Sequence, residues 1–175
     1  MTGVLSRCSR KAAGPVARQP LAVFDLDGTL ADVRHRLHHL RRRPKDWDAF
    51  FRAAVDDPPL DEGVRLALAR AEDHELAYVT GRPERCRRDT VEWLERHGLP
   101  PGRLLMRAPG DYRPARVAKP GLLRQVARDR TVAVVVDDDH AVCDAYESAG
   151  FTVLRAGWMA AADTLQEAQE CEGRT

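Results

Sequence analysis

Residues 21–30 read LAVFDLDGTL, an apolar run that ends in two aspartates one residue apart and then a glycine. Four apolar residues without alternation, at 21–24, are typical of a strand covered on both faces, as in a parallel sheet. Gly28 allows a bend that a side chain would resist. Because side chains of an extended chain repeat with a period of two, Asp25 and Asp27 can point the same way at the carboxyl end of the strand, where open α/β sheets bind their ligands.

Two carboxylates this close repel each other by about 4 kcal/mol at a separation of ~4 Å and an effective dielectric of about 20. A divalent cation would offset the repulsion, and oxygen-only ligands favour magnesium. Alternatively one acid keeps its proton and serves as a general acid near neutral pH. Both arrangements can hold together. A calcium-binding loop of the EF-hand type is disfavoured, because its further acids and flanking helix pattern are missing.

The 175 residues suffice for one domain with a hydrophobic core. A hydrophobic content of 43% with 31% charged residues predicts a soluble globular protein. No stretch approaches the roughly 18 apolar residues of a transmembrane helix, and the amino terminus lacks an apolar signal core, so we expect a cytoplasmic protein without membrane contact. The cysteines lack a CxxC pair, which predicts idle thiols at Cys8, Cys86, Cys143 and Cys171.

Positive charge is grouped along the chain, although the formal net charge is only +1. Residues 1–19 are expected to form a flexible basic tail. Residues 33–45 hold six lysines and arginines and three histidines without an acid, and residues 103–119 hold five basic residues against Asp111 alone. The grouping predicts an anionic substrate. His35 and His39 have the spacing of metal ligands on a helix, but a solvated basic face is the preferred interpretation because no third ligand lies nearby.

Strands and helices alternate along the chain, which predicts an α/β fold: a Rossmann-like parallel sheet with helices on both faces and a small or absent cap. The domain is expected to span 20–170, with a small helical insertion near 32–58. Strands are predicted at 21–24, 76–79, 104–106, 131–136 and 151–154, and helices at 32–43, 45–55, 61–73, 84–97, from about 120, and at 140–149.

Three predicted strands end in polar residues suited to phosphate chemistry. Asp25 and Asp27 follow the first, Thr80 the second, and Asp137 with Asp138 the fourth. The chain contains neither the phosphate loop GxxxxGK[ST] nor a serine or cysteine hydrolase elbow. The available nucleophile is therefore a carboxylate, which can attack phosphorus and form an acyl phosphate that water later cleaves.

Four motifs in this order resemble those of the haloacid dehalogenase-like phosphatases, over about residues 20–155. The first motif of that family, DxDGT, corresponds to residues 25–29. The corresponding later positions are Thr80, Lys119, Asp137 and Asp138. The resemblance implies a phosphoric monoester hydrolase that works through an aspartyl phosphate and uses Mg²⁺.

The resemblance also implies a role for each residue. Asp25 would be the nucleophile, and Asp27 the general acid and base, with a pKa raised by its acidic neighbours. Thr80 and the Gly81 amide would hold phosphoryl oxygens, and Lys119 would neutralise charge. The expected metal ligands are Asp25, the main-chain carbonyl of Asp27, Asp137 and, directly or through water, Asp138.

A narrower likeness is to the phosphatase domain of phage-type polynucleotide kinase/phosphatase enzymes, which remove 3′-phosphates from nucleic-acid ends. It rests on VTGRP at 79–83, LMRAPGDYR at 105–113, and VDD at 136–138. At Asp139 the sequence departs from the pattern, because those enzymes often carry a basic or polar residue there. The likeness implies that the substrate is bound by Gly81, Arg82, Arg107 and Arg113. For the last two, a structural ion-pair cluster with the intervening acid is the alternative.

The function expected from these residues is Mg²⁺-dependent removal of 3′-phosphates from nucleic-acid ends. One alternative is a phosphatase of mononucleotides or another small phosphate. A second is a catalytically weak nucleic-acid-binding module whose carboxylates only hold a metal; the intact pair Asp25 and Asp27 weighs against it. Phosphorylated nucleic-acid ends or nucleotides are the expected partners, and the oligomeric state is left open.

Overall fold

A five-stranded parallel sheet forms the centre of the computed structural model, which describes residues 18–159 and 163–172. The strand order is β3-β2-β1-β4-β5, and every neighbouring pair is parallel. The strands are β1 (Leu21–Phe24), β2 (Glu75–Pro83), β3 (Arg103–Arg107), β4 (Val132–Asp137) and β5 (Val153–Arg155). The predicted α/β fold with a Rossmann-like sheet is confirmed.

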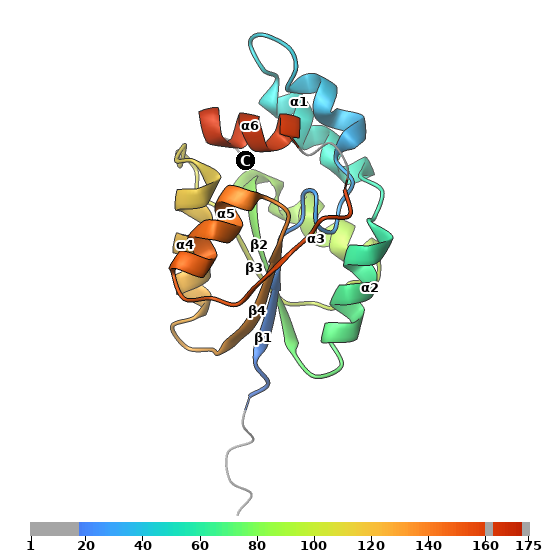
Figure 1. Ribbon diagram of the computed structural model, residues 1–175. Coiled ribbons are helices and arrows are strands. Elements are labelled where there is room, and N and C mark those ends of the chain that lie inside the picture. Colours follow the sequence, from blue (N-terminus) through green and yellow to red (C-terminus); the bar gives the residue numbers. More distant parts are fainter. Residues whose placement is uncertain (1–17, 160–162, 173–175) are drawn as a thin grey trace, which may run out of the picture.

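Helices cover both faces of this sheet. Figure 1 shows α4 and α5 on one face, α2 and α3 on the other, and α1 and α6 above the carboxyl ends of the strands. The helices are α1 (Trp47–Arg52), α2 (Asp61–Arg70), α3 (Arg87–Arg96), α4 (Ala115–Val126), α5 (His140–Ser148) and α6 (Asp163–Glu172), and three 3₁₀ turns are η1 (Arg34–His39), η2 (Ala53–Asp56) and η3 (Glu84–Cys86).

The central strand β1 explains why its apolar run does not alternate. Leu21 and Val23 belong to the hydrophobic cluster under α4 and α5. Ala22 and Phe24 belong to the cluster on the other face, together with Trp93 of α3. Since both faces of β1 are covered, polar residues first occur where the strand ends, at the edge that α1 and α6 overlie.

A third hydrophobic cluster joins the insertion after β1 to α6. It contains the aromatic residues Trp47, Phe50 and Phe51 of α1 together with Leu165 and Ala168 of α6. A helix was predicted over 45–55, and α1 lies there with all three aromatic side chains buried. Helix α6, in contrast, was not among the predicted elements.

Two predicted helices differ from those observed. The basic helix expected over 32–43 is only the 3₁₀ turn η1. Helix α4 begins at Ala115, before the start expected near Pro120, which lies inside it. The earlier start is possible because the Pro114 carbonyl accepts bonds from the amides of Val117 and Ala118, at 2.9 and 3.0 Å.

The remaining expectations concern the amino-terminal tail, the cysteines and membrane-spanning helices. Most of the predicted basic tail, residues 1–17, lies outside the described residues, and so does Cys8. The described cysteines are free; Cys86 and Cys143 are buried and Cys171 is exposed. No helix of the described chain is both long and apolar enough to cross a membrane.

Candidate active site

The ends of β1 and β4 bring three buried carboxylates together. Asp25, Asp137 and Asp138 each offer an oxygen that lies within 4.8 Å of the others. The pairing of the two strands continues to this point, because the Asp25 amide donates to the Val136 carbonyl at 2.9 Å. We call these three residues the carboxylate cluster. Within the described chain, it is the one group of side chains placed to hold a metal ion.

Lys119 of α4 reaches between two members of the carboxylate cluster. Its Nζ lies 2.9 Å from Asp137 Oδ2 and 3.1 Å from Asp25 Oδ1. Burial opposes the charged form, yet Asp137 and Asp25 hold the pKa of Lys119 well above its ordinary value. The three carboxylates of the cluster therefore face one positive charge, that of Lys119.

The negative charge of the three carboxylates exceeds the positive charge that Lys119 supplies. Burial, with the neighbouring acids, raises the pKa of Asp138 to about 7. Burial likewise raises the pKa of Asp137, and it raises that of Asp25 well above the ordinary range despite Lys119. Among the described residues, Asp25 Oδ1 has an ion pair with Lys119 but no well-aligned hydrogen bond. An all-oxygen set with excess negative charge fits a hard divalent cation.

The turn after β1 packs directly against the cluster. Gly28 has a φ of +91°, and a Cβ at this position would lie 2.3 Å from Asp138 Oδ2. Thr29 Oγ1 donates to Asp138 Oδ1 at 3.2 Å. Glycine is thus required here both for the backbone conformation and for the close approach of Asp138.

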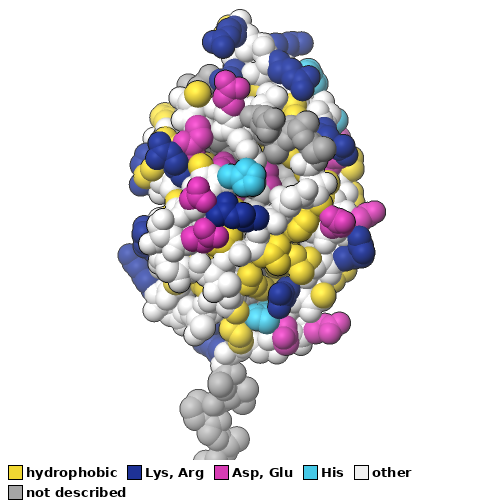
Figure 2. Space-filling view, viewed as in Figure 1, with side chains coloured by type: hydrophobic (Ala, Val, Ile, Leu, Met, Phe, Trp, Pro, Cys, Tyr) yellow, Lys and Arg dark blue, Asp and Glu magenta, His cyan; other side chains and the backbone are white. Residues whose placement is uncertain are grey.

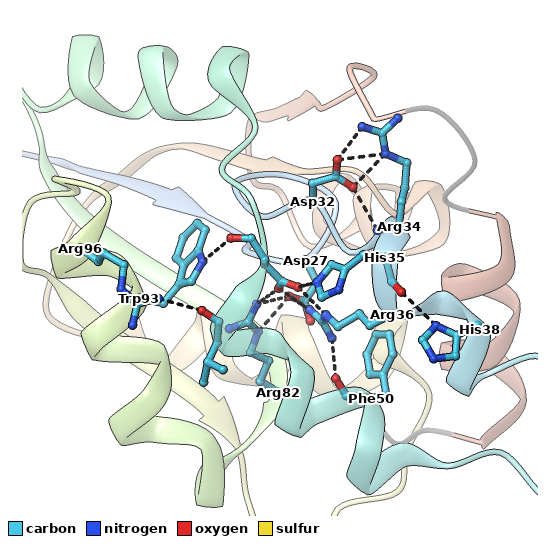
Figure 3. Close-up of polar contacts among 12 residues, drawn as sticks. Asp27, Asp32, Arg34, His35, Arg36, His38, Phe50, Arg82, Trp93 and Arg96 are labelled. Carbon is cyan, nitrogen blue, oxygen red and sulfur yellow. Dashed lines mark hydrogen bonds and ion pairs between the residues drawn. The ribbon is translucent and has the colours of Figure 1, made fainter.

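Asp27 lies apart from the carboxylate cluster. Its Oδ1 accepts from Arg36 Nη2 and from Arg82 Nε, both at 2.8 Å, and both arginines point toward it (Figure 3). Burial alone would raise the pKa of Asp27, but the two guanidiniums lower it to about 2. The prediction that acidic neighbours raise this pKa is therefore wrong for this structure, because the arginines contact Asp27 directly.

A second aspartate holds the same two arginines. Asp57 accepts from Arg36 Nε and Nη2, both at 2.7 Å, and from Arg82 Nη2 at 2.9 Å. His35 Nε2 lies 2.8 Å from Asp57 Oδ1. The arginines and Asp57 are almost completely buried. We call Asp27, Arg36, Asp57 and Arg82 the ion-pair network, in which two negative and two positive charges balance.

Sequence reasoning missed Arg36 and Asp57. Arg36 was counted only as part of the basic stretch 33–45, and Asp57 was given no role within the expected insertion near 32–58. No local pattern separates the buried Arg36 from its exposed neighbours, because its partners come from other segments. Only the tertiary arrangement identifies it.

Thr80 and Gly81 lie buried within β2, beside β1. The register pairs Phe24 with Tyr78, which puts Thr80 level with residue 26 at the edge that carries Asp25. Thr80 Oγ1 accepts from the Arg82 amide at 3.2 Å. The Arg82 side chain belongs to the ion-pair network and donates to Asp27. Arg82 therefore contacts Thr80 through its amide and Asp27 through its guanidinium.

Arg107 and Arg113 lie in the loop region after β3. Arg107 is buried and donates to the main-chain carbonyls of Asp111 and Arg113. Arg113 is exposed and forms an ion pair with Asp111, with Nη2 and Oδ2 2.7 Å apart. This geometry agrees with the structural ion-pair cluster given as the alternative, and substrate contact by these arginines stays a prediction.

Two further polar positions have structural partners. Asp139 caps α5, because its Oδ1 accepts from the amides of Ala141 and Val142 at 2.9 and 3.2 Å. His35 contacts Asp57, and His39 packs on the ring of His38. Neither histidine belongs to the group of described residues that could hold a metal.

Comparisons with known proteins identify one family. The family whose sequence model matches residues 19–157 is described as "Polynucleotide kinase PNKP phosphatase domain". No curated protein matches the chain.

Solved structures share the fold. Chains of the "Structure of Pnkp1/Rnl/Hen1 complex" and the "Structure of the Pnkp1/Rnl/Hen1 RNA repair complex" each match with a TM-score of 0.66 and 22% identity over 87% of this chain. The match covers 51% and 47% of those chains, so this chain spans about half their length. A haloacid dehalogenase-like family protein from Streptococcus pneumoniae matches with a TM-score of 0.58 and 15% identity, over 87% of this chain and 92% of that one.

Proposed function

The chain belongs to the family of the polynucleotide kinase PNKP phosphatase domain, a group of haloacid dehalogenase-like phosphatases, and from this premise we propose that it removes 3′-phosphates from nucleic-acid ends with the help of Mg²⁺. The observation that carries the proposal is the carboxylate cluster around Lys119, which lies within the residues that the family matches. Its oxygen donors suit magnesium.

The first half of the reaction would depend on Asp25. A carboxylate oxygen of Asp25 attacks phosphorus, the bond to the leaving oxygen breaks, and an acyl phosphate forms on Asp25. The cluster and the main-chain carbonyl of Asp27 would hold Mg²⁺, which when bound supplies positive charge for the phosphoryl oxygens. Lys119 neutralises charge next to Asp25 throughout, and Thr80 with the Gly81 amide would hold phosphoryl oxygens.

The second half would use Asp27 as a base. With a pKa of about 2, its carboxylate is ionised at neutral pH and can take a proton from the water that cleaves the acyl phosphate. To act as the general acid in the first half of the reaction, Asp27 would have to be protonated, and its contacts with Arg36 and Arg82 disfavour the protonated form. If the substrate phosphate draws Arg82 away from Asp27, the pKa of Asp27 rises toward that of a general acid.

One observation favours the second candidate, a phosphatase of mononucleotides or another small phosphate. The site lies beneath α1 and α6 (Figure 1), and Asp25 is only 3% exposed. On the β4 side, Gln166 of α6 donates to the Asp138 carbonyl at 3.1 Å. Such cover favours a small phosphate; of nucleic-acid substrates, it would admit the free end of a single strand more readily than the interior of a duplex.

A phosphate-release assay distinguishes these candidates. The substrates are one oligonucleotide sequence with a 3′-phosphate or a 5′-phosphate and the matching 3′-mononucleotide, each tested with Mg²⁺ and with a chelator. We expect kcat/KM to be highest for the 3′-phosphorylated oligonucleotide, by about tenfold or more, and to be lost in the chelator. Equal turnover of the mononucleotide would favour the second candidate. Binding of oligonucleotides without any phosphate release would point to the catalytically weak module.

A further inference from the structure

A pocket of about 260 Å³ lies at the carboxyl ends of β2 and β3, on the β2 side of the strand β1 that leads to Asp25. No member of the cluster lines it. We call it the side pocket. Its walls include residues from three parts of the chain: Trp47 and Phe51 of α1, Pro83 and Arg85 at the end of β2 and in η3, and Arg107 and Tyr112 at the end of β3 and in the loop that follows.

We propose that the side pocket binds the base of the nucleotide that carries the 3′-phosphate, an inference that rests on the proposed function. The site for phosphate chemistry and the side pocket are then two parts of one binding surface. The first takes the phosphate and the second takes the terminal base.

The order of the strands places the side pocket where the body of the substrate would lie. Pro83 directly follows Arg82, whose guanidinium contacts Asp27. On the opposite side of β1, α6 covers β4 through the bond from Gln166 to the Asp138 carbonyl. Helix α6 is also tied to α4 by the ion pair of Arg116 with Glu170, 2.6 Å apart. A phosphate at Asp25 therefore has cover toward β4 and a pocket toward β2 and β3.

The chemistry of the walls suits a flat, aromatic ligand. The rings of Trp47 and Phe51 stack at 5.8 Å with an interplanar angle of 26°, and both residues are only 4% exposed, so they form a fixed aromatic wall. Tyr112 is 64% exposed. Aromatic side chains stack on any of the bases, because every base has a π face.

Charged side chains complete the side pocket, with Arg85 and Arg107 beside Asp48 and Asp111. The Arg85 guanidinium lies 5.5 Å from the Phe51 ring centroid and forms an ion pair with Asp48, at 2.6 Å. Because both partners of this pair are largely exposed, the pair is weak and Arg85 can turn toward a base or a phosphate. Arg107, by its bonds to the loop carbonyls, fixes the segment that carries Tyr112.

The volume sets the size of the ligand. At about 260 Å³, the side pocket is somewhat smaller than the roughly 300–1,000 Å³ of pockets for drug-sized molecules. It has room for one base and not for a run of nucleotides. The predicted recognition is therefore of the terminal base, without strong preference for its identity, since stacking is sequence-tolerant.

The test compares Tyr112→Ala with wild-type protein on two 3′-phosphorylated oligonucleotides, one intact and one without the terminal base. On the intact strand, Tyr112→Ala should raise KM about five- to tenfold, whereas Tyr112→Phe, which keeps the ring, should not. Removing the base should raise the wild-type KM by a similar factor. Tyr112→Ala should then add no further loss on the abasic strand, because the same contact is already gone.

Binding without turnover gives an independent measurement. In Asp25→Asn protein, a 3′-terminal 2-aminopurine should lose fluorescence on binding through stacking, and additional Tyr112→Ala should restore it. Val117→Ala, at a 43% exposed position of α4 that does not line the side pocket, is the matched control and should change neither result.

The possible failures are distinguishable. If the intact and the abasic oligonucleotide are turned over with the same KM, and Tyr112→Ala changes neither value, the side pocket does not bind the base. The proposed function would then remain intact. Failure to release phosphate from either oligonucleotide, with ready hydrolysis of a small phosphate monoester, would overturn both.

Discussion

Asp57 shares both arginine partners of Asp27. It lies in the loop after η2, has no exposed side-chain surface, and contacts both Arg36 and Arg82. Its main-chain carbonyl also accepts from Trp93 Nε1 at 2.8 Å, which fixes the loop to α3. Removing its charge would leave two buried guanidiniums with Asp27 as their remaining carboxylate partner in the network.

Asp57→Asn should therefore lower the free energy of unfolding by about 3–5 kcal/mol, the usual effect of breaking a buried pair. Urea unfolding of the two proteins at neutral pH measures this. Asp129→Asn is the control, because Asp129 pairs with Arg103 in an ion pair that is about half exposed, and its loss should leave the transition nearly unchanged. Equal effects of the two substitutions would show that the network does not stabilise the fold.

Gly28 gives a second prediction at this scale. Gly28→Ala should remove the rise in Tm that Mg²⁺ produces, because the new Cβ would displace Asp138 from the carboxylate cluster. Gly150→Ala is a matched control: its φ of +86° imposes similar backbone strain, but nothing lies within 4 Å of the new Cβ. Both variants should lose stability, and only Gly28→Ala should lose the response to metal. An undiminished response in Gly28→Ala would contradict the placement of Asp138.

Individual residues differ in how far the sequence predicts them. Asp25, Asp137 and Asp138 were identifiable because each lies at or just after the end of an apolar strand, and such ends meet at one edge of a parallel sheet. The residues of the ion-pair network around Asp27 were not identifiable from the sequence. Arg36 and Asp57 come from segments whose positions depend on tertiary packing. The roles given to these residues stay predictions.

At the scale of elements, β1 and β4 confine like charges at one edge of the sheet. The folded chain holds the pKa values of the carboxylate cluster above those of the unfolded chain, near 7 for Asp138. The folded state therefore binds more protons than the unfolded state between about pH 4 and pH 7. Bound Mg²⁺ requires the ionised carboxylates, so metal and protons compete.

The metal-free protein should accordingly become more stable as the pH falls from about 8 to about 5, because protonation removes the repulsion within the cluster. The increase in Tm on adding Mg²⁺ should be largest at pH 8 and small by pH 5. Thermal unfolding across this range, with Mg²⁺ and with a chelator, provides the measurement. A metal effect that is independent of pH would contradict the raised pKa values.

The elements with a clear period or a clear stop were predictable from the sequence. Strand β1 and helix α5, which ends just before Gly150, match their expected positions within a residue or two. Helix α6 was not expected, since no helix was predicted beyond residue 149. The start of α4 depends on a capping carbonyl at Pro114 that local propensity does not reveal.

At the scale of the whole molecule, positive charge gathers at the end that carries the site. Figure 2 shows Lys and Arg side chains at the top of the molecule, above α1 as placed in Figure 1. The segment there is the basic loop, residues 41–45, in which Arg41, Arg42 and Arg43 are exposed. The basic stretch 33–45 is thus divided, because Arg36 is buried in the ion-pair network. The sequence predicted the charge but not this division.

The basic loop should contact the phosphates of a bound strand. Each contact with a single strand contributes about −0.7 to the slope of log affinity against log salt, so Arg41→Ala with Arg42→Ala should make the slope shallower by about 1.4. The measurement uses catalytically inactive Asp25→Asn protein and 3′-phosphorylated oligonucleotides of increasing length. The control pair, Arg124→Ala with Arg128→Ala, removes two exposed arginines, one in the last turn of α4 and one just after it, and should leave the slope unchanged. Length-independent, salt-insensitive binding would favour a small-molecule substrate.

The central claim is that Asp25 takes the phosphoryl group of a 3′-phosphorylated strand. The most direct measurement is rapid acid quenching of the reaction with a 3′-radiolabelled oligonucleotide and Mg²⁺. Wild-type protein should carry label that hydroxylamine removes, on the peptide that contains Asp25. Asp25→Asn, whose fold is checked by circular dichroism, should carry none and should release phosphate about a thousandfold more slowly or worse. Phosphate release by folded Asp25→Asn at close to the wild-type rate would contradict the account.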